Sequence, residues 1–307
     1  IGDDKLQDTF RTTLKSFYGA LKSKDDCIKF AMLTGVTKFG KVSVFSDLNN
    51  LKDISLDNRY YNLCGIDEGE LHGVFEPYVQ RLADSQNITL DKAYSELKRN
   101  YDGYHFSKNM VGMYNPFSLL NAFDSLEIGN YWFETGTPSY LVELMQDQDM
   151  KLWSITKKLV SSDVLNSVDI ATTEPISVIF QSGYLTIKGY KNEYDGYLLG
   201  FPNEEVKRGF LRYLIPRYTS VRPSDTAFEI ESFVEEVRGG DISGFMKRLK
   251  SFFANTPYDL IKDTENHYQN VLFILCNLCG LYTKAEFHTS NGRVDMTIET
   301  PDYVYIF

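Results

Sequence analysis

Two carboxylates near the C-terminal end of this 307-residue chain could take part in metal-dependent chemistry. Glu265 opens an apolar, helix-like run, and Asp295 lies in segment 293–299, where apolar and polar residues alternate. Mg²⁺ prefers hard oxygen ligands, so the pair could begin a divalent-metal site. A strand aspartate beside a turn is also typical of a solvated or turn-stabilising residue. The residue types leave both interpretations open.

The elements that must position this pair follow one another closely. The apolar run 265–279 predicts a helix that ends at Gly280 as its C-cap. Residues 281–289 then predict a strand, residues 290–292 a turn, and residues 293–299 and 303–307 two further strands. The expected order is therefore helix, strand, hairpin turn, strand, turn and strand.

This order resembles the core of a PD-(D/E)XK nuclease domain, because it carries Gly292-Arg-Val-Asp-Met296 and Pro301-Asp-Tyr-Val-Tyr-Ile-Phe307. It resembles more narrowly the version fused behind an AAA-ATPase-like domain in bacterial proteins. The resemblance implies that Asp295 and a Glu beyond the third strand hold Mg²⁺, that Glu265 assists at the metal from the helix, and that Gln269, one helical turn beyond Glu265, is a supporting residue. In that family the third strand continues into a Glu-x-Lys element, and this chain ends where the element is expected. We therefore expect half a nuclease site, and no cleavage of DNA by this chain.

The N-terminal part contains a second candidate site. The apolar run 28–33 predicts a buried parallel strand, and its end carries Thr34-Gly-Val-Thr-Lys38. This stretch and Val44-Phe-Ser-Asp-Leu-Asn-Asn-Leu-Lys-Asp-Ile-Ser55 resemble the AAA-ATPase-like family. The resemblance implies Thr34 as a nucleotide sensor, supported by Thr37 and Lys38. The residues alone fit a strand-to-loop turn with a capping threonine equally well.

The sequence lacks the motifs that hold nucleotide phosphates. No GxxxxGK[ST] loop occurs, and no apolar strand ends in paired acids for Mg²⁺. Backbone amides and a lysine must cradle the β- and γ-phosphates, so we expect this chain not to hydrolyse ATP. ATP and Mg²⁺ are expected as cofactors of the full-length protein, and none is expected in this chain.

The central part predicts helices with recognisable starts. Asp67 with Glu70, Thr89, and Asn115 before Pro116 are typical N-caps. Three motifs strengthen the resemblance to the AAA-ATPase-like family: Tyr101-Asp-Gly-Tyr104, Tyr114-Asn-Pro-Phe-Ser118 and Asn130-Tyr-Trp-Phe-Glu-Thr-Gly-Thr-Pro138. Aromatic residues around glycine and proline also pack compact helical units without any ligand.

Later segments predict a hairpin-like pair, 181–187 and 197–206, and then three helices between 204 and 254 that break at 220–224 and 239–240. The expected fold is α/β and multidomain. Residues 1–200 form the C-terminal part of a P-loop NTPase-like, AAA-ATPase-like domain with a helical lid. Residues 201–225 form a linker helix region, and residues 226–307 form a truncated restriction-endonuclease-like domain.

Composition limits the function classes. A hydrophobic content of 43% predicts a globular protein, and the net charge of −10 argues against a general nucleic-acid coat. No apolar run reaches transmembrane length, so no membrane partner and a cytoplasmic location are expected. Cys276 and Cys279 have CxxC spacing but lie in an apolar run, which favours buried structural thiols over a metal site.

The primary hypothesis is a fragment of an ATPase-nuclease fusion protein. Its parent would be a nucleotide-gated, Mg²⁺-dependent DNA phosphodiesterase, with DNA as partner. The alternative is a non-catalytic, nucleotide-sensing or protein-interaction module in which the nuclease-like fold is structural. A Glu-x-Lys element directly after Phe307 would discriminate in favour of the enzyme.

Overall fold

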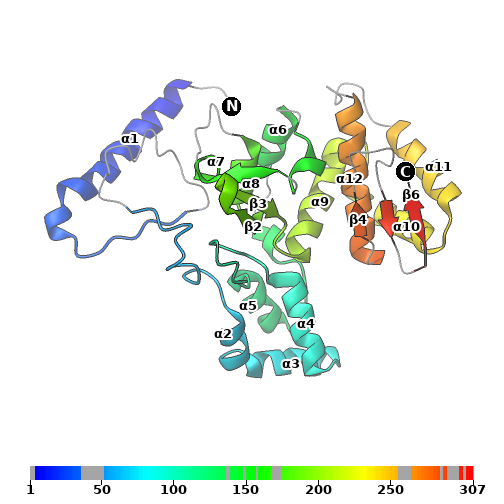
Figure 1. The fold of residues 1–307 in the computed structure, drawn as a ribbon, viewed down its shortest axis with the longest axis horizontal. Coiled ribbons are helices and arrows are strands. Elements are labelled where there is room, and N and C mark those ends of the chain that lie inside the picture. The colour runs from blue at the N-terminus through cyan, green and yellow to red at the C-terminus, as the bar shows by residue number, and fades with distance from the viewer. Residues whose placement is uncertain are drawn as a thin grey trace.

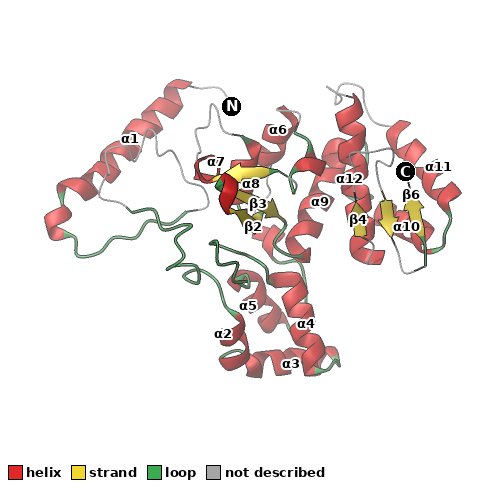
Figure 2. Cartoon of the chain, viewed as in Figure 1, coloured by secondary structure: helices red, strands yellow, loops and turns green. Residues whose placement is uncertain are grey.

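The computed structural model describes residues 4–35, 52–135, 139–147, 150–156, 158–166, 174–254, 264–283, 286–288, 297–299 and 302–306. Within these ranges the protein is mostly helical, with two small antiparallel sheets (Figures 1 and 2). The helices are α1 (Asp4–Ser23), α2 (Glu68–Gly73), α3 (Glu76–Gln86), α4 (Leu90–Tyr101), α5 (Pro116–Ser125), α6 (Ser139–Asp147), α7 (Ser162–Asn166), α8 (Pro175–Gln181), α9 (Glu204–Tyr218), α10 (Thr226–Arg238), α11 (Ile242–Ala254) and α12 (Thr264–Thr283). The strands are β1 (Leu159–Ser161), β2 (Thr186–Lys191), β3 (Gly196–Gly200), β4 (Glu286–His288), β5 (Thr297–Glu299) and β6 (Val304–Ile306).

Helices α2 to α5 begin largely where local chemistry predicts. Asp67 and Glu70 form a capping box at α2, in which each side chain accepts a hydrogen bond from the other residue's backbone N–H. Thr89 caps α4, and Asn115 caps α5 with Pro116 at the first helical position. All three predicted caps are confirmed. They satisfy N–H groups that the first turn of a helix leaves without a backbone partner.

Helices α2 to α5 enclose a hydrophobic core of their own, and we call these four helices the lobe. They project from the rest of the molecule in Figure 1. The buried core residues of the lobe are Ile66, Leu71, Val79, Leu82, Ala83, Ala93, Leu97, Tyr101, Tyr114, Leu119, Ala122 and Phe123. Apolar residues at helical spacing account for this core, because each amphipathic helix must bury one face.

The first sheet has the strand order β1–β3–β2, with both pairings antiparallel. The predicted hairpin-like pair leading into a helix is present as β2 and β3 followed by α9, but its first strand is β2 at 186–191 and not 181–187, because residue 181 ends α8. A shift of register between Ile187 and Gly189 interrupts the pairing. Asn203 caps α9 by accepting a hydrogen bond from the Val206 N–H.

A second, larger hydrophobic core joins this sheet to helices α9 to α12, and we call the elements that share it the body. It runs from Tyr104 to Cys279 in sequence, and α12 packs against both α9 and α10. Three helices between 204 and 254, broken at 219–225 and 239–241, confirm the predicted breaks. The core therefore continues through the region proposed as a linker, and the division into domains stays a prediction.

The expected parallel strand at 28–33 is absent from the described residues, where 28–35 form no regular element. Phe30 is 81% exposed, and Met32 and Leu33 are also exposed. A strand is held by hydrogen bonds to a neighbour, and no described segment pairs with this one. An apolar run indicates burial but does not supply the partner strand.

Gly280 was also predicted wrongly as a helix end, because α12 continues to Thr283. A glycine inside a helix costs about 1 kcal/mol relative to alanine, which does not by itself end the helix. Residues such as Ile274 and Leu278 are buried in the larger core, and this burial offsets the cost. The rest of the predicted C-terminal order is confirmed, since α12 is followed by β4, β5 and β6 in one antiparallel sheet.

Helix α1 exposes an apolar stripe, formed by Leu6, Phe10, Leu14 and Phe17. These residues recur at the spacing of one helix face. No helix in the described ranges combines the length and the apolar character needed to cross a bilayer.

Candidate functional site

Glu265 and Gln269 lie together at the N-terminal end of α12. Both side chains are exposed, and the Gln269 Nε2 donates a hydrogen bond to the Glu265 Oε1 at 3.3 Å. They are one helical turn apart, which places them on the same face. A carboxylate in the first turn is also stabilised by the helix dipole. The structure thus brings these two predicted residues together at the surface.

Asp295 lies outside the described residues. The strand that should carry it, β5, is described from Thr297 and pairs with both β4 and β6. In this register Thr297 lies opposite His288 on β4 and Ile306 on β6. The position of β5 between β4 and β6 agrees with the predicted middle strand. That Asp295 lies close to Glu265 stays a prediction.

Thr34 is exposed in the irregular segment 28–35, and Thr37 and Lys38 lie outside the described residues. The described part of this candidate nucleotide site thus consists of one exposed hydroxyl on irregular backbone. A phosphate site requires converging N–H groups or cations, and these are not supplied by Thr34. The described residues do not fit ATP by themselves.

The described residues fit Mg²⁺ only in part. Glu265 is an exposed, hard oxygen donor of the type that the ion prefers. Among the residues that the structure describes, no group of three or more His, Cys, Asp or Glu side chains could hold a metal. One carboxylate does not make a site, and the second predicted one is Asp295.

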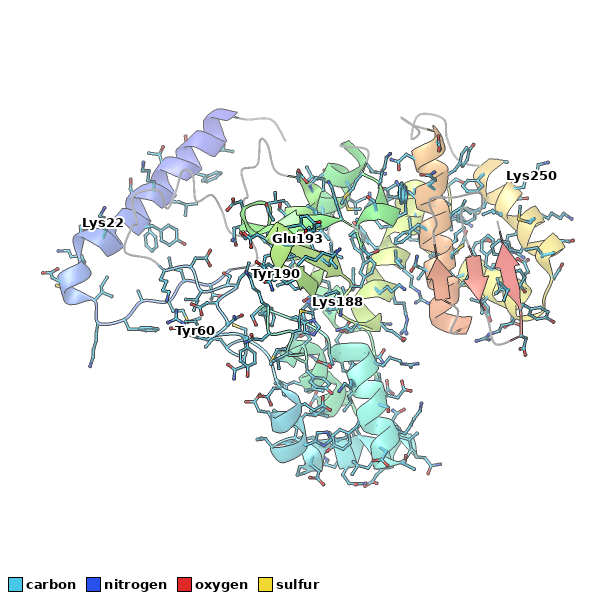
Figure 3. All side chains as sticks on the ribbon, viewed as in Figure 1. Lys22, Tyr60, Lys188, Tyr190, Glu193 and Lys250 are labelled. Atoms are coloured by element: carbon cyan, nitrogen blue, oxygen red, sulfur yellow. The ribbon has the colours of Figure 1, made fainter. Side chains whose placement is uncertain are left out.

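Sequence reasoning missed a group of polar residues where the lobe meets the body. Lys188 on β2 lies centrally in Figure 3, and its Nζ donates hydrogen bonds to the carbonyls of Gly103 at 3.2 Å and Pro202 at 3.0 Å. Desolvation of this ammonium group lowers the pKa of Lys188, and the nearby Asp102 carboxylate opposes the shift. Burial raises the pKa of Asp102.

His105 continues this contact. Its backbone N–H donates to the Thr186 hydroxyl at 2.7 Å, and its Nδ1 lies 2.8 Å from the Ile187 carbonyl oxygen. A carbonyl can only accept, so Nδ1 carries the proton. Burial lowers the pKa of His105, with a further contribution from Lys188, which favours the neutral ring. These bonds fasten the Tyr101-Asp-Gly-Tyr104 motif to β2, and the motif has a packing role here.

Cys276 and Cys279 are buried structural thiols, as predicted. Burial raises the pKa of Cys276 well above its usual value and that of Cys279 to about 12. The thiolate is the reactive and metal-binding form, so both groups are chemically inert at neutral pH.

Both ends of the chain are similar to known protein families. The family described as "Predicted AAA-ATPase" matches residues 1–45, and the family described as "PD-(D/E)XK nuclease superfamily" matches residues 263–307. These matches confirm the resemblance to an AAA-ATPase-like protein with a C-terminal nuclease-like region.

One relative matches nearly the whole chain. It is the "Uncharacterized protein in vnfD 5'region" of Azotobacter chroococcum mcd 1, which is 34% identical over 304 residues. The match covers 97% of this chain and 56% of the relative, so the chain spans little more than half the length of that protein. No solved structure matches the chain.

Proposed function

We propose that this chain is part of a Mg²⁺-dependent DNA phosphodiesterase whose activity is gated by a nucleotide. The observation that carries the proposal is the presence of two family matches in one chain, AAA-ATPase-like at residues 1–45 and nuclease-like at residues 263–307. The second match covers α12 and the β4–β5–β6 sheet. Helix and antiparallel strands in that order support the proposal.

Asp295 and Glu265 are the proposed metal-binding carboxylates, and Gln269 is the proposed support for Glu265. The exposure of Glu265 is consistent with this role, because a metal and a DNA strand must both reach it. The hydrogen bond from Gln269 restricts the rotamer of Glu265. Bound Mg²⁺ would supply charge stabilisation at the phosphate and a more acidic water.

The net charge of −10 requires that DNA meet a local basic surface, since contact with phosphates is electrostatic. Cleavage should therefore decline steeply as salt is raised. This dependence provides a readout of DNA binding that is separate from metal binding.

The test is cleavage of linear duplex and single-stranded DNA by the complete protein, with Mg²⁺ or Mn²⁺ and with or without ATP. Asp295→Asn should abolish cleavage while thermal stability is retained, because the two side chains are nearly isosteric. Asp302→Asn removes an exposed carboxylate in the turn before β6 and is the matched control, with wild-type cleavage expected.

Full cleavage by the Asp295→Asn protein would refute the assignment of the metal site. A complete protein that binds nucleotide but cleaves no DNA with either metal would favour the alternative, a nucleotide-sensing interaction module. A rate that is the same with and without ATP would leave the nuclease proposal standing and remove the gating.

A further inference from the structure

The lobe and the body have separate hydrophobic cores, which are connected by hydrogen bonds and by the Trp132 and Phe133 rings packed against the body core. The lobe core ends at Phe123 in sequence, and the body core includes Tyr184, Val206 and Phe210. We call the contact between these two sides the seam: α4, α5 and residues 102–105 and 126–133 on one side, and β2, Pro202 and α9 on the other. The contacts of Lys188 and His105 described above belong to it.

Glu205, in the first turn of α9, lies at the centre of the seam. Its side chain is 0% exposed, and its Oε1 accepts two backbone hydrogen bonds, from the Tyr131 N–H at 2.7 Å and from the Trp132 N–H at 3.0 Å. Residues 131 and 132 lead from the lobe into the short 3-10 helix Trp132–Thr135. The carboxylate therefore holds the chain where it leaves the lobe.

Groups from both sides face this carboxylate. The Ser118 side chain on α5 lowers the pKa of Glu205, and Arg208, one turn further along α9, lowers it as well. Tyr101 and Tyr104 lie close enough to Glu205 for its carboxylate charge to contribute to raising the pKa of both hydroxyl groups. Burial is the largest influence and raises the pKa of Glu205.

The same short segment is fixed on either side of Glu205. The Tyr101 hydroxyl accepts a hydrogen bond from the Gly129 N–H at 2.9 Å and donates to the Gly129 carbonyl at 3.0 Å. Beyond the carboxylate, the Phe133 ring lies directly on α9 at Gly209, where an added Cβ would come within 2.1 Å of it. Residues 131–133 thus dock on α9 at Glu205 and Gly209.

We propose that Glu205 is a latch at the seam, which opens locally while the lobe and the body each keep their own core. A buried carboxylate suits this role because opening returns it to water and recovers its hydration. The seam rests on few side chains, whereas each core is a continuous cluster, so the seam should open at a lower free energy than either core.

Hydrogen exchange measured by mass spectrometry on the complete protein tests this proposal. Two backbone hydrogen bonds to a buried carboxyl oxygen are lost in Glu205→Ala. Peptides covering 127–133 and 203–209 should then exchange at least about tenfold faster. Peptides from α3 in the lobe and from α10 and α11 in the body should keep wild-type rates.

Two variants separate the latch from other effects. Glu205→Gln keeps an oxygen that accepts both N–H groups and should exchange at nearly the wild-type rate. Glu231→Gln removes the charge of an exposed glutamate on α10, outside the seam, and should keep wild-type rates.

Uniformly faster exchange in both cores of Glu205→Ala would overturn the proposal, because the residue would then support global stability only. Unchanged exchange at 127–133 would overturn it as well. If Glu205→Ala does not fold, the wild type decides the question in low concentrations of denaturant. The amides of Tyr131 and Trp132 should exchange through a local opening whose free energy is lower than that of global unfolding. If these amides exchange only through global unfolding, the latch is refuted.

Discussion

The Asn270 side chain on α12 binds the backbone of Leu152, which is 118 residues away in sequence. Its Oδ1 accepts a hydrogen bond from the Leu152 N–H at 2.8 Å, and its Nδ2 donates to the Met150 carbonyl at 2.9 Å. Leu152 begins a short 3-10 helix whose N-cap residue, Lys151, offers no side-chain hydrogen bond. Asn270 therefore completes the start of that helix from a distant element.

Asn270→Ala should destabilise the protein by about 1–3 kcal/mol, because it leaves the buried Leu152 N–H and the partly buried Met150 carbonyl without this partner. Denaturant unfolding measures the change. Asn192→Ala, at an exposed position, is the matched control and should stay within about 0.5 kcal/mol of wild type. If Asn270→Ala changes the free energy of unfolding no more than the control does, water replaces the hydrogen bonds of the side chain without loss of stability.

Glu205→Gln should change how stability depends on pH. Because burial raises the pKa of Glu205, the folded state keeps this proton at a pH where the unfolded state, with its usual value of 4.5, has lost it. The contribution of this residue to stability is fully present below about pH 4.5 and declines as the pH rises through the folded pKa. The glutamine side chain does not titrate, so the variant does not lose stability in this way. Between the unfolded and the folded pKa of Glu205, the stability of the variant should therefore rise relative to that of wild type. Above the folded pKa the difference should stay constant. Unfolding free energies from pH 4 to pH 8 measure this, and a variant that loses stability relative to wild type as the pH rises would contradict it.

Gly209→Ala should destabilise the protein although alanine favours helices. The gain in helix propensity is about 1 kcal/mol, whereas overpacking a well-filled site costs about 1–3 kcal/mol. The Phe133 ring cannot move freely, since it contacts the Trp132 and Tyr184 rings at centroid distances of 5.2 and 5.7 Å. Gly73→Ala, where no atom lies within 4 Å of the added Cβ, should be neutral or slightly stabilising.

A double-mutant cycle isolates the cause. In a Phe133→Ala background, Gly209→Ala should no longer destabilise, because the clashing ring is gone. The same loss in both backgrounds would assign the cost to something other than Phe133.

Mg·ATP should not raise the melting temperature of this 307-residue chain. Its sequence has no phosphate-binding loop, so no nucleotide should bind. Binding would be easy to detect, because a ligand present at about 100 times its Kd stabilises the native state by about 2.7 kcal/mol. Thermal unfolding over a range of ATP concentrations provides the measurement, with ADP and inorganic phosphate as controls for weak ionic effects. A saturable shift specific to Mg·ATP would show that the chain builds a nucleotide site without that loop.

The sequence by itself determined the features that depend on neighbouring residues. The caps at Asp67, Thr89 and Asn115 need only a side-chain oxygen two or three residues before a free N–H, so spacing predicts them. The β2–β3 hairpin and the order of α12, β4, β5 and β6 follow from short-range periodicity in the same way. Glu265 and Gln269 share a helix face for the same local reason.

Contacts between distant segments were decided only by the tertiary structure. Glu204 and Glu205 are adjacent acids in the first turn of α9 and look alike in sequence. Only Glu205 is fully buried, and the backbone of Tyr131 and Trp132 binds its side chain. Lys188 and Asn270 likewise gain their roles from carbonyls and N–H groups 14 to 120 residues away. The apolar run at 28–33 predicted a strand, but a strand exists only when a partner segment pairs with it, and spacing along the chain does not contain that information.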